Sequence, residues 1–435
     1  MLYGATEETL RDIRDRMAKS SETSPKEDTL EKIHESLKQI AASVTGKVED
    51  VDNWEQVAAA VQSGKHVLTF NTGDQLIPTW KDASGATYDD PFDIVEVECS
   101  PELQNGQAVH GMMLQQHYAN IANCPFDPQE ALYDADEELP AGTYHFTVAG
   151  DTWLTSENGK KIQFTLTKPI PKGGQLVYAN TEGCDVALAG QKISTYSGPM
   201  SFTAIETVAL SEGEGGTDLG STDGKGKLNH HQRAFRGCGR WKTSMLRQYL
   251  NSNKVAGQWW SKQDKWDRAS AFINSVPGFL AGFPVNFLGI LRPVKVCTAR
   301  DTLVLDGGTD ITYDSFFPVS LEQLMVTPQA EGVEGKALSY WKEIAANSTD
   351  LDSSGRFKQY GTYPLLRTYG LNAKSSARNC WLRSAHRGNS CNAWSVSASG
   401  SVGGSSALTG YSCAPACVIV APQSSAANPL AASEG

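Results

Sequence analysis

The chain has 435 residues, of which 40% are hydrophobic, and carries a net charge of −11 at pH 7. A chain of this length can hold roughly two to four domains, and its composition is that of a globular protein rather than a disordered one. The acidic balance disfavours DNA or RNA as partners, because they require a clustered basic surface. No stretch approaches the length of a membrane span, so no membrane partner is expected.

The N-terminus and the cysteines both indicate synthesis in a reducing compartment. The opening sequence MLYGATEETLRDIRDRM is charged within its first turns and lacks the apolar core of a signal peptide. Nine cysteines, an odd number, are spread over the chain, which fits a reduced cytosolic protein better than a disulfide framework. We expect most of them to be small buried hydrophobes.

Residues 1–50 have the pattern of a helix. The apolar positions lie three or four residues apart, at Leu10, Ile13 and Met17 and then at Leu30, Ile33, Leu37, Ile40 and Val44. The second set spans two heptads with polar flanks and predicts a short coiled-coil stem for attachment and oligomerisation. An amphipathic helix that packs on its own domain is the alternative, and the Leu/Ile pattern does not fix the number of strands in a coil.

Residues 51–124 predict a helix over 54–61 and then short strands over 67–70, 73–77 and 92–98, separated by Gly, Asp and Pro. Residues 125–207 contain four segments of alternating polarity, at 142–148, 161–166, 174–178 and 200–203. Turns of the Pro-x-Gly kind separate them, so we expect a small inserted β-sandwich of jelly-roll type without site chemistry.

Residues 208–422 begin with a Gly-rich loop at 212–224 and a helix at 239–251. That helix places Met245, Leu246, Tyr249 and Leu250 on one apolar stripe. A second helix over 264–274 and strands near 292–297 and 303–305 are expected to follow. Residues 423–435 form a tail.

The segment from Trp381 to Ser412 combines an aromatic frame with small residues. Trp381, Leu382, Trp394, Val396 and Val402 supply apolar side chains, and Ser, Gly, Ala and Asn fill most of the positions between them. No Lys, Glu, Gln or Met occurs between Ala385 and Ser412. This pattern indicates a fixed framework that displays an exchangeable face. The alternative is an ordinary Ser/Gly-rich strand that is half exposed.

This segment resembles the variable region of C-type lectin-like proteins diversified by retroelements in bacteria and phages. The likeness rests on the WLRS opening at 381–384 and the run CNAWSVSASGSV at 391–402. The family includes phage tail-fibre and receptor-binding proteins of the major tropism determinant type. Adenine-directed mutagenesis in that family never produces Lys, Glu, Gln, Met or Trp, and the residues missing here fit that rule.

The resemblance implies a fold and a domain order. The fold class is α+β, with a C-type lectin-like domain of the formylglycine-generating-enzyme type, an inserted small β-sandwich and an N-terminal helical or coiled-coil stem. Residues 1–50 would be the stem, 51–124 the opening of the lectin-like domain and 125–207 the insertion. Residues 208–422 would be the ligand-binding remainder, with the variable region at 381–412. A homo-oligomer, most simply a trimer, is implied.

The resemblance also assigns ligand-binding positions. Trp381, Arg383, Trp394 and Gly400 would be scaffold, while Tyr411, Arg387 and His386 would be the main anchors, since aromatic and arginine side chains contribute most at interfaces. The full set of exchangeable positions is His386, Arg387, Gly388, Ser390, Cys391, Asn392, Ser395, Ser397, Ser401, Gly403, Gly404, Ser405, Ser406, Leu408, Tyr411 and Ser412.

Catalytic chemistry is not expected. Neither a phosphate-binding P-loop nor a G-x-S-x-G nucleophile motif is present. Cys413 and Cys417 form a possible redox pair, because the lectin-like fold also hosts formylglycine-generating enzymes that use two cysteines. Buried packing is the favoured interpretation of these two thiols.

Metal binding is not expected either. His230 and His231 are neighbours, and neighbours on a strand point to opposite faces, so they are a poor chelate. Asp306, Asp310 and Asp314 form an acidic turn with a possible calcium role, but it lacks the spacing of an EF-hand. We predict no catalytic residue, no metal and no cofactor.

The sequence therefore predicts a phage virion adhesin that binds a bacterial surface receptor, either a protein or a glycan. Its stem would attach it to phage structural proteins, and the protein would be made in the host cytoplasm and exposed on the assembled particle. Two alternatives stay open: a capsid-decorating or head-fibre protein, and a lectin-like-fold enzyme of the formylglycine-generating type.

Overall fold

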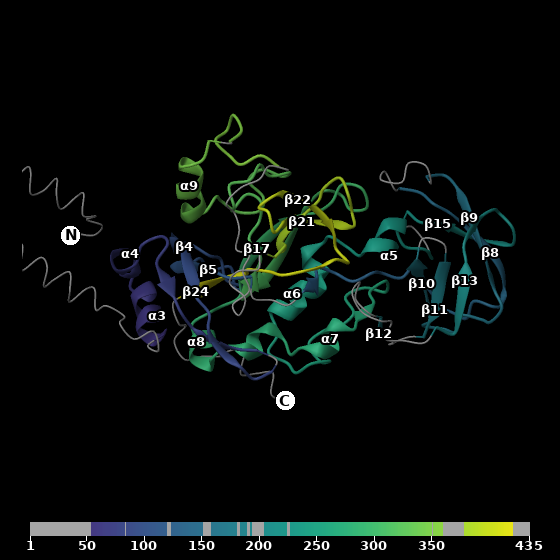
Figure 1. Ribbon diagram of the computed structural model, residues 1–435, viewed down its shortest axis with the longest axis horizontal. Coiled ribbons are helices and arrows are strands. Elements are labelled where there is room, and N and C mark those ends of the chain that lie inside the picture. The colour runs from purple at the N-terminus through teal and green to yellow at the C-terminus, as the bar shows by residue number, and fades with distance from the viewer. Residues whose placement is uncertain are drawn as a thin grey trace, which may run out of the picture.

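The computed structural model (Figure 1) describes residues 54–82, 84–119, 123–150, 158–180, 183–188, 192–193, 204–223, 227–349, 351–359 and 378–420. Strands make up 35% and helices 15% of the structure, and the strands form many small sheets. The predicted α+β class is therefore wrong, because the molecule is mainly β and is built of many small sheets. The predicted stem at 1–50 lies outside the described residues.

A five-stranded sheet joins residues that are far apart in the sequence. Its order is β1 (Gln75–Leu76), β4 (Phe92–Cys99), β5 (Gly111–Gln116), β24 (Ala416–Val420) and β19 (Phe316–Phe317). Every residue of β5 and β24 is buried, as expected for central strands of a covered sheet. Helices α3 (Trp54–Gln62) and α4 (His66–Thr69) lie beside this sheet in Figure 1. Residues near both ends of the described chain thus share one core.

Short helices and aromatic rings fill the space next to this sheet. They are η1 (Trp241–Thr243), α6 (Met245–Leu250), α7 (Phe272–Ser275), η2 (Phe279–Gly282), α8 (Val285–Gly289) and α9 (Ser339–Ala346), whereas α5 (His231–Arg236) packs on the two-sheet unit described below. The predicted stripe of α6 is confirmed, since all four of its apolar residues are buried. Phe283 stacks on Phe316 with ring centroids 5.5 Å apart, which ties the helices to β19. Within the described part of the chain, no helix is long and apolar enough to cross a membrane.

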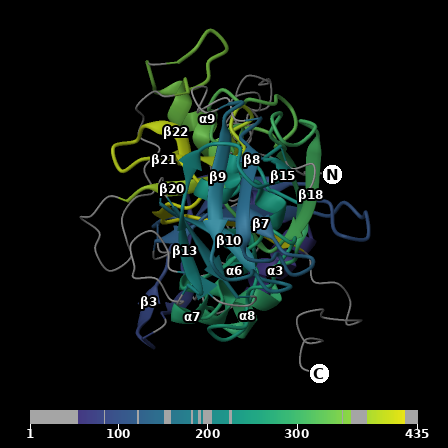
Figure 2. The same ribbon diagram turned by 90° about the vertical axis from the view of Figure 1, so that its right-hand side faces the viewer.

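Two four-stranded sheets form a separate unit at the right of Figure 1 and in the foreground of Figure 2. One sheet contains β7 (Tyr133–Asp134), β10 (Gln175–Asn180), β11 (Gly183–Ala187) and β13 (Glu206–Ala209). The other contains β8 (Gly142–Thr147), β9 (Lys161–Leu166), β14 (Ser211–Glu212) and β15 (Thr217–Ser221). The two sheets enclose their own hydrophobic core.

The segment predicted as a Gly-rich loop over 212–224 contributes strands to this unit, because β15 pairs in parallel with β8. Gly216 makes that approach possible. Its φ is 76°, and a Cβ there would lie 1.8 Å from the carbonyl oxygen of Thr143. Only glycine fits such a close backbone contact.

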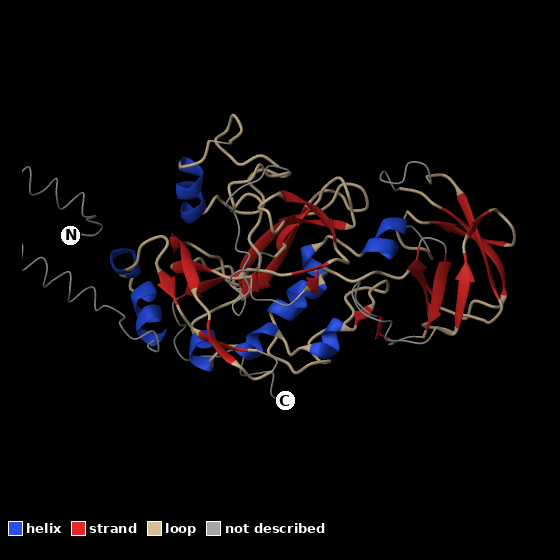
Figure 3. Ribbon diagram, viewed as in Figure 1, coloured by secondary structure: helices blue, strands red, loops and turns tan. Residues whose placement is uncertain are grey.

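The remaining strands form small sheets, which Figure 3 shows in red among long loops. They are the pairs β2 (Thr79–Lys81) with β3 (Thr87–Asp89), β6 (Cys124–Pro125) with β23 (Gly410–Tyr411), β12 (Lys192–Ile193) with β16 (Ala269–Ser270), and β17 (Val294–Ala299) with β18 (Thr309–Asp314), and the triplet β20 (Cys380–Ala385), β21 (Asn392–Val396) and β22 (Val402–Ser406).

Three local predictions were wrong. Residues 67–70 lie mostly in the short helix α4. Residues 303–305 form a turn, because one carboxylate oxygen of Asp301 accepts the backbone N–H groups of all three. The helix predicted over 264–274 is reduced to α7, since the side chains of Asp264 and Asp267 accept nearby backbone N–H groups and favour a turn.

Candidate ligand-binding surface

The segment singled out in the sequence forms a three-stranded antiparallel sheet in the order β20, β21, β22. Trp394 of β21 lies opposite Gly404 of β22, and Ser395 lies opposite both Trp381 and Gly403. The predicted frame is buried, since the side chains of Trp381, Trp394 and Val402 are at most 1% exposed. Strand β22 is one of the two outer strands of this sheet, so its small residues lie at an edge.

Alternation along the strands sends neighbouring positions to opposite faces of the sheet. Ser395 and Ser405 share one face, where their hydroxyl oxygens lie 2.8 Å apart. On that side Tyr411 packs against Trp381 at a centroid distance of 4.7 Å. The other face carries Trp394, on which the ring of His386 stacks. The predicted positions therefore do not form one flat patch, and they come together only at the β22 edge and at the turns.

Four predicted contact residues are buried and need correction: Ser390, Cys391, Ser395 and Ser412. A ligand cannot reach these side chains in this structure. Their small polar groups are used inside the protein: the Cys391 thiol donates to Gln232 Oε1 at 3.2 Å, and Ser395 Oγ contacts Ser405. A serine or cysteine in a sequence is compatible with either a solvated or a buried hydrogen-bonded position.

The other predicted positions reach the surface to different degrees. Gly388 is exposed, and the half-buried positions are His386, Arg387, Asn392, Ser397, Ser401, Gly403, Gly404, Ser405, Ser406, Leu408 and Tyr411. They belong to strand β22, the start of β21, the turns before and after β21 and, for Tyr411, strand β23. The two turns lie at opposite ends of β21, so the positions are spread along the β22 edge and over both ends of the sheet.

Arg387 is held in place by two neighbouring loops. Its guanidinium donates to the carbonyl oxygen of Gly307 at 3.1 Å, and its backbone N–H donates to Gln329 Oε1 at 2.7 Å. The backbone N–H of Thr302 donates to the Arg387 carbonyl oxygen at 2.9 Å. These contacts hold the half-buried Arg387 in one orientation.

The buried side chain of Arg383 connects the β20–β22 sheet to the segment around 318–334. Its guanidinium donates to the carbonyl oxygens of Pro318 and Glu334 and to Gln323 Oε1, and it lies over the ring of Phe317. Burial lowers the pKa of Arg383 and raises the pKa of Glu334. This buried network connects β20 to the segment around 318–334 and keeps the framework rigid.

Several residues at or near the candidate surface were not predicted from the sequence. Ser399 is exposed and Thr409 half-buried, yet the family pattern does not mark them. Gln329, Thr302 and Gly307 support the site from loops that precede Trp381 by more than 50 positions in the chain, and no local signal connects them to the segment from Trp381 to Ser412. Only the three-dimensional contacts identify them.

The two cysteines considered as a redox pair do not have the environment of a reactive thiol. Cys413 and Cys417 are fully buried, and burial raises the pKa of both thiols well above the ordinary value, so neither is a ready thiolate. All nine cysteines are free. Seven of them are buried, which confirms their predicted role as core residues.

The aspartates considered for calcium pair with arginines, and His231 of the histidine pair lies in a helix. Asp310 binds Arg240 at 2.6 Å, and Asp314 binds Arg247 at 2.6 Å. These arginines neutralise the carboxylates that calcium would need. His231 begins helix α5 rather than lying on a strand, so the strand argument used for the histidine pair was wrong.

Among the described residues, two groups bring possible metal ligands within 4.8 Å of one another: Asp127, Glu130 and Cys238, and Glu130, Asp264 and Asp267. They lie where the chain enters and leaves the two-sheet unit. Burial raises the pKa of Asp127 well above its usual range, and it also raises the pKa of Glu130. Burial therefore favours the protonated forms of Asp127 and Glu130.

Protein stability should depend on the charge of this cluster. Burial, together with repulsion from Asp264, raises the pKa of Asp267 to about 8 from the ordinary 3.8. The folded protein then keeps a proton that the unfolded chain loses, so this stabilisation is complete below about pH 4 and is lost as the pH rises towards 8. We expect the free energy of unfolding to fall by on the order of 2 kcal/mol between about pH 5 and pH 8. In Asp267→Asn the fall should be smaller, and urea titrations at both pH values measure it. Identical pH slopes for the two proteins would contradict this assignment.

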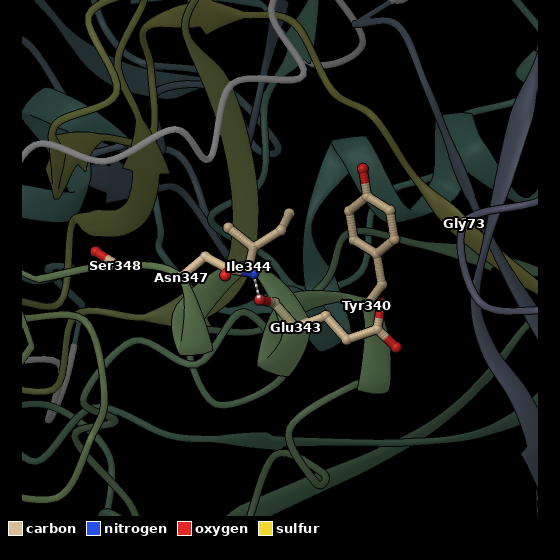
Figure 4. Close-up of a pocket in the computed structure, with 6 residues that line it drawn as sticks. All are labelled: Gly73, Tyr340, Glu343, Ile344, Asn347 and Ser348. Atoms are coloured by element: carbon tan, nitrogen blue, oxygen red, sulfur yellow. Dashed lines mark hydrogen bonds between the residues drawn. The ribbon is translucent and has the colours of Figure 1, made fainter. Parts of the chain in front are cut away.

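A hollow of about 460 Å³ lies between the turn at Gly73 and helix α9 (Figure 4). Its other lining residues are Tyr340, Glu343, Ile344, Asn347 and Ser348. Asn347 Nδ2 donates to the carbonyl oxygen of Glu343 at 2.9 Å. The lining offers the carboxylate of Glu343, the phenol of Tyr340 and the hydroxyl of Ser348, and it contains no histidine, cysteine or lysine. No predicted site residue faces it.

Comparison with known proteins gives one partial match. Residues 217–421 match a family model described as a domain of unknown function, DUF6273. No curated protein and no solved structure matches the chain. The matched segment begins at β15 and ends just after β24, so it contains the whole β20–β22 sheet and leaves out most of the two-sheet unit.

Proposed function

We propose that this chain is a bacteriophage adhesin that binds a receptor on the bacterial surface through the β22 edge of the β20–β22 sheet and the turns beside it. One observation carries the proposal. Small, mostly uncharged and half-buried side chains at this edge are mounted on a frame that is itself buried and fixed by hydrogen bonds. Such a surface can change its side chains without losing its fold.

The contact surface is narrower than the sequence predicts. It comprises the half-buried and exposed positions around β22 and its turns, and it leaves out Ser390, Cys391, Ser395 and Ser412 because they are buried. Arg387 and Tyr411 are its anchors, since each is partly accessible and is held by framework contacts. Serine and glycine positions add little affinity, so several copies on one particle would raise the avidity.

An adsorption assay tests this function. Virions that carry the double substitution Arg387→Ala and Tyr411→Ala should attach to host cells at least about tenfold more weakly, because interface arginine and tyrosine side chains often contribute more than 1 kcal/mol each. A matched control removes the same residue types elsewhere, at half-buried Tyr88 and Arg356, and should leave adsorption unchanged.

The outcome separates adhesion from decoration. Intact virions that carry the double substitution and adsorb normally would contradict the adhesin proposal and favour a capsid-decorating or head-fibre role. Circular dichroism of the purified variants checks that both double variants keep the native fold.

A further inference from the structure

The imidazole of His386 covers the buried indole of Trp394. Their ring centroids are 5.2 Å apart and their planes are nearly parallel, at 9°. Trp394 is 0% exposed, whereas His386 is half-buried. Burial lowers the pKa of His386, so the stacked ring is uncharged at neutral pH. An offset parallel arrangement at this distance is a favourable aromatic contact.

Gly404 makes room for the imidazole. It lies opposite Trp394 on the neighbouring strand, and a Cβ added there would be 2.6 Å from Cδ2 of His386. Trp394 therefore forms the floor of a slot, and Gly404 forms one of its walls. The chain's own histidine fills this slot.

The floor is fixed independently of the histidine ring. The indole Nε1 of Trp394 donates to Gln329 Oε1 at 3.1 Å, and the same oxygen accepts the backbone N–H of Arg387 at 2.7 Å. The backbone N–H of His386 donates to the carbonyl oxygen of Asn392 at 3.0 Å. These bonds hold the indole and the turn backbone, so the imidazole side chain can be removed without removing the support of the floor.

We propose that the slot over Trp394 is a binding subsite for an aromatic side chain of a protein receptor, and that residue 386 controls access to it. This inference rests on the proposed function, in which position 386 is exchangeable. With histidine at 386, the tethered ring occupies the subsite at a high effective concentration and excludes the ligand. With a small residue at 386, the ligand's ring stacks on the indole.

The His386 ring that fills the slot indicates which kind of ligand group the slot accepts, namely an aromatic ring. A neutral, planar ring lies parallel to the indole, and such pairs gain from stacking beyond the area they bury. A rigid cavity lined by apolar groups that is emptied of its side chain can bind a small ring from solution. The identity of residue 386 is thus a specificity determinant for ligands that present an exposed aromatic side chain.

The full-length His386→Ala variant tests the subsite with small probes. Imidazole, phenol and methyl glucopyranoside are titrated at about pH 8, where free imidazole is uncharged, and binding is followed by ligand-observed saturation-transfer NMR. Imidazole and phenol should bind the variant with dissociation constants on the order of millimolar, as expected for rings of so few atoms. Binding to the wild-type chain should be at least tenfold weaker.

The double variant His386→Ala with Gly404→Val is the matched control. The valine methyl groups point into the slot, so ring binding should be lost while circular dichroism stays native. If His386→Ala does not fold, His386→Asn takes its place, because its side chain is too short to cover the indole.

Three results would overturn the proposal. They are a folded His386→Ala variant that binds neither phenol nor imidazole, equal binding by the control variant, and binding of the glucoside without phenol, which would indicate a glycan ligand. The probe assay uses no receptor or virion. A failed adsorption assay therefore removes the adhesin and leaves the slot measurable, whereas failed ring binding removes only the subsite.

Discussion

Replacing Arg383 by leucine is expected to lower the free energy of unfolding by about 3–5 kcal/mol, because it leaves buried partners without their cation. The Arg383 guanidinium donates to the carbonyl oxygens of Pro318 and Glu334 and to the side chain of Gln323, and the Glu334 carboxyl lies in the same buried network. Leucine keeps part of the apolar packing on Phe317 but provides no donor. Urea unfolding at neutral pH measures the difference.

A surface arginine provides the control for this experiment. Arg356 pairs with the exposed carboxylate of Glu331, so Arg356→Leu should change stability by no more than about 0.5 kcal/mol. An Arg383→Leu variant that loses less than about 1 kcal/mol would show that the network does not hold the sheet.

Replacing Trp381 by alanine is the second large change, with an expected loss of about 3–5 kcal/mol. The indole is 1% exposed, packs on Phe126 at 5.5 Å and supports Tyr411 at 4.7 Å. Its Nε1 also donates to the carbonyl oxygen of Cys124 at 2.9 Å. Loss of the ring removes the support of Tyr411, so the receptor binding that we propose should weaken even where the protein still folds.

Trp381→Phe separates packing from hydrogen bonding. It should cost less than the alanine change and restore the support of Tyr411, because a ring still fills most of the space. Thermal unfolding and adsorption are measured on both variants. A phenylalanine variant as unstable as the alanine variant would mean that the ring's packing is not the main contribution of Trp381.

Elements whose apolar residues recur with a clear helix or strand period were predicted correctly from the sequence. Helix α6 was predicted because its apolar residues recur on one stripe, and strand β9 because its residues alternate. Helix α4 and the turn after Asp301 were missed, because short apolar runs fit helix, strand or turn equally well. The insertion of β24 between β5 and β19 is a pairing of distant segments that no local pattern carries.

At the candidate site the framework was predicted from the sequence, but the burial of small polar residues and the long-range contacts were not. The tryptophan frame was recognised from residue type and spacing, and both indoles are buried as expected. Burial of Ser390, Ser395 and Ser412 was not foreseen, because small polar residues are stable in either environment when they find a partner. The roles of Gln329 and Glu334 were missed because their contacts with Trp394 and Ser384 cross many positions of the chain.

The central claim is that the accessible residues at the β22 edge and in the neighbouring turns vary in sequence, while the buried frame of the β20–β22 sheet stays constant. Sequencing this gene in several closely related isolates tests it most directly. The account predicts that substitutions are confined to accessible positions such as His386, Arg387, Ser405 and Tyr411, while Trp381, Arg383 and Trp394 stay the same. Substitutions spread evenly over the chain, or concentrated in the buried frame, would contradict it.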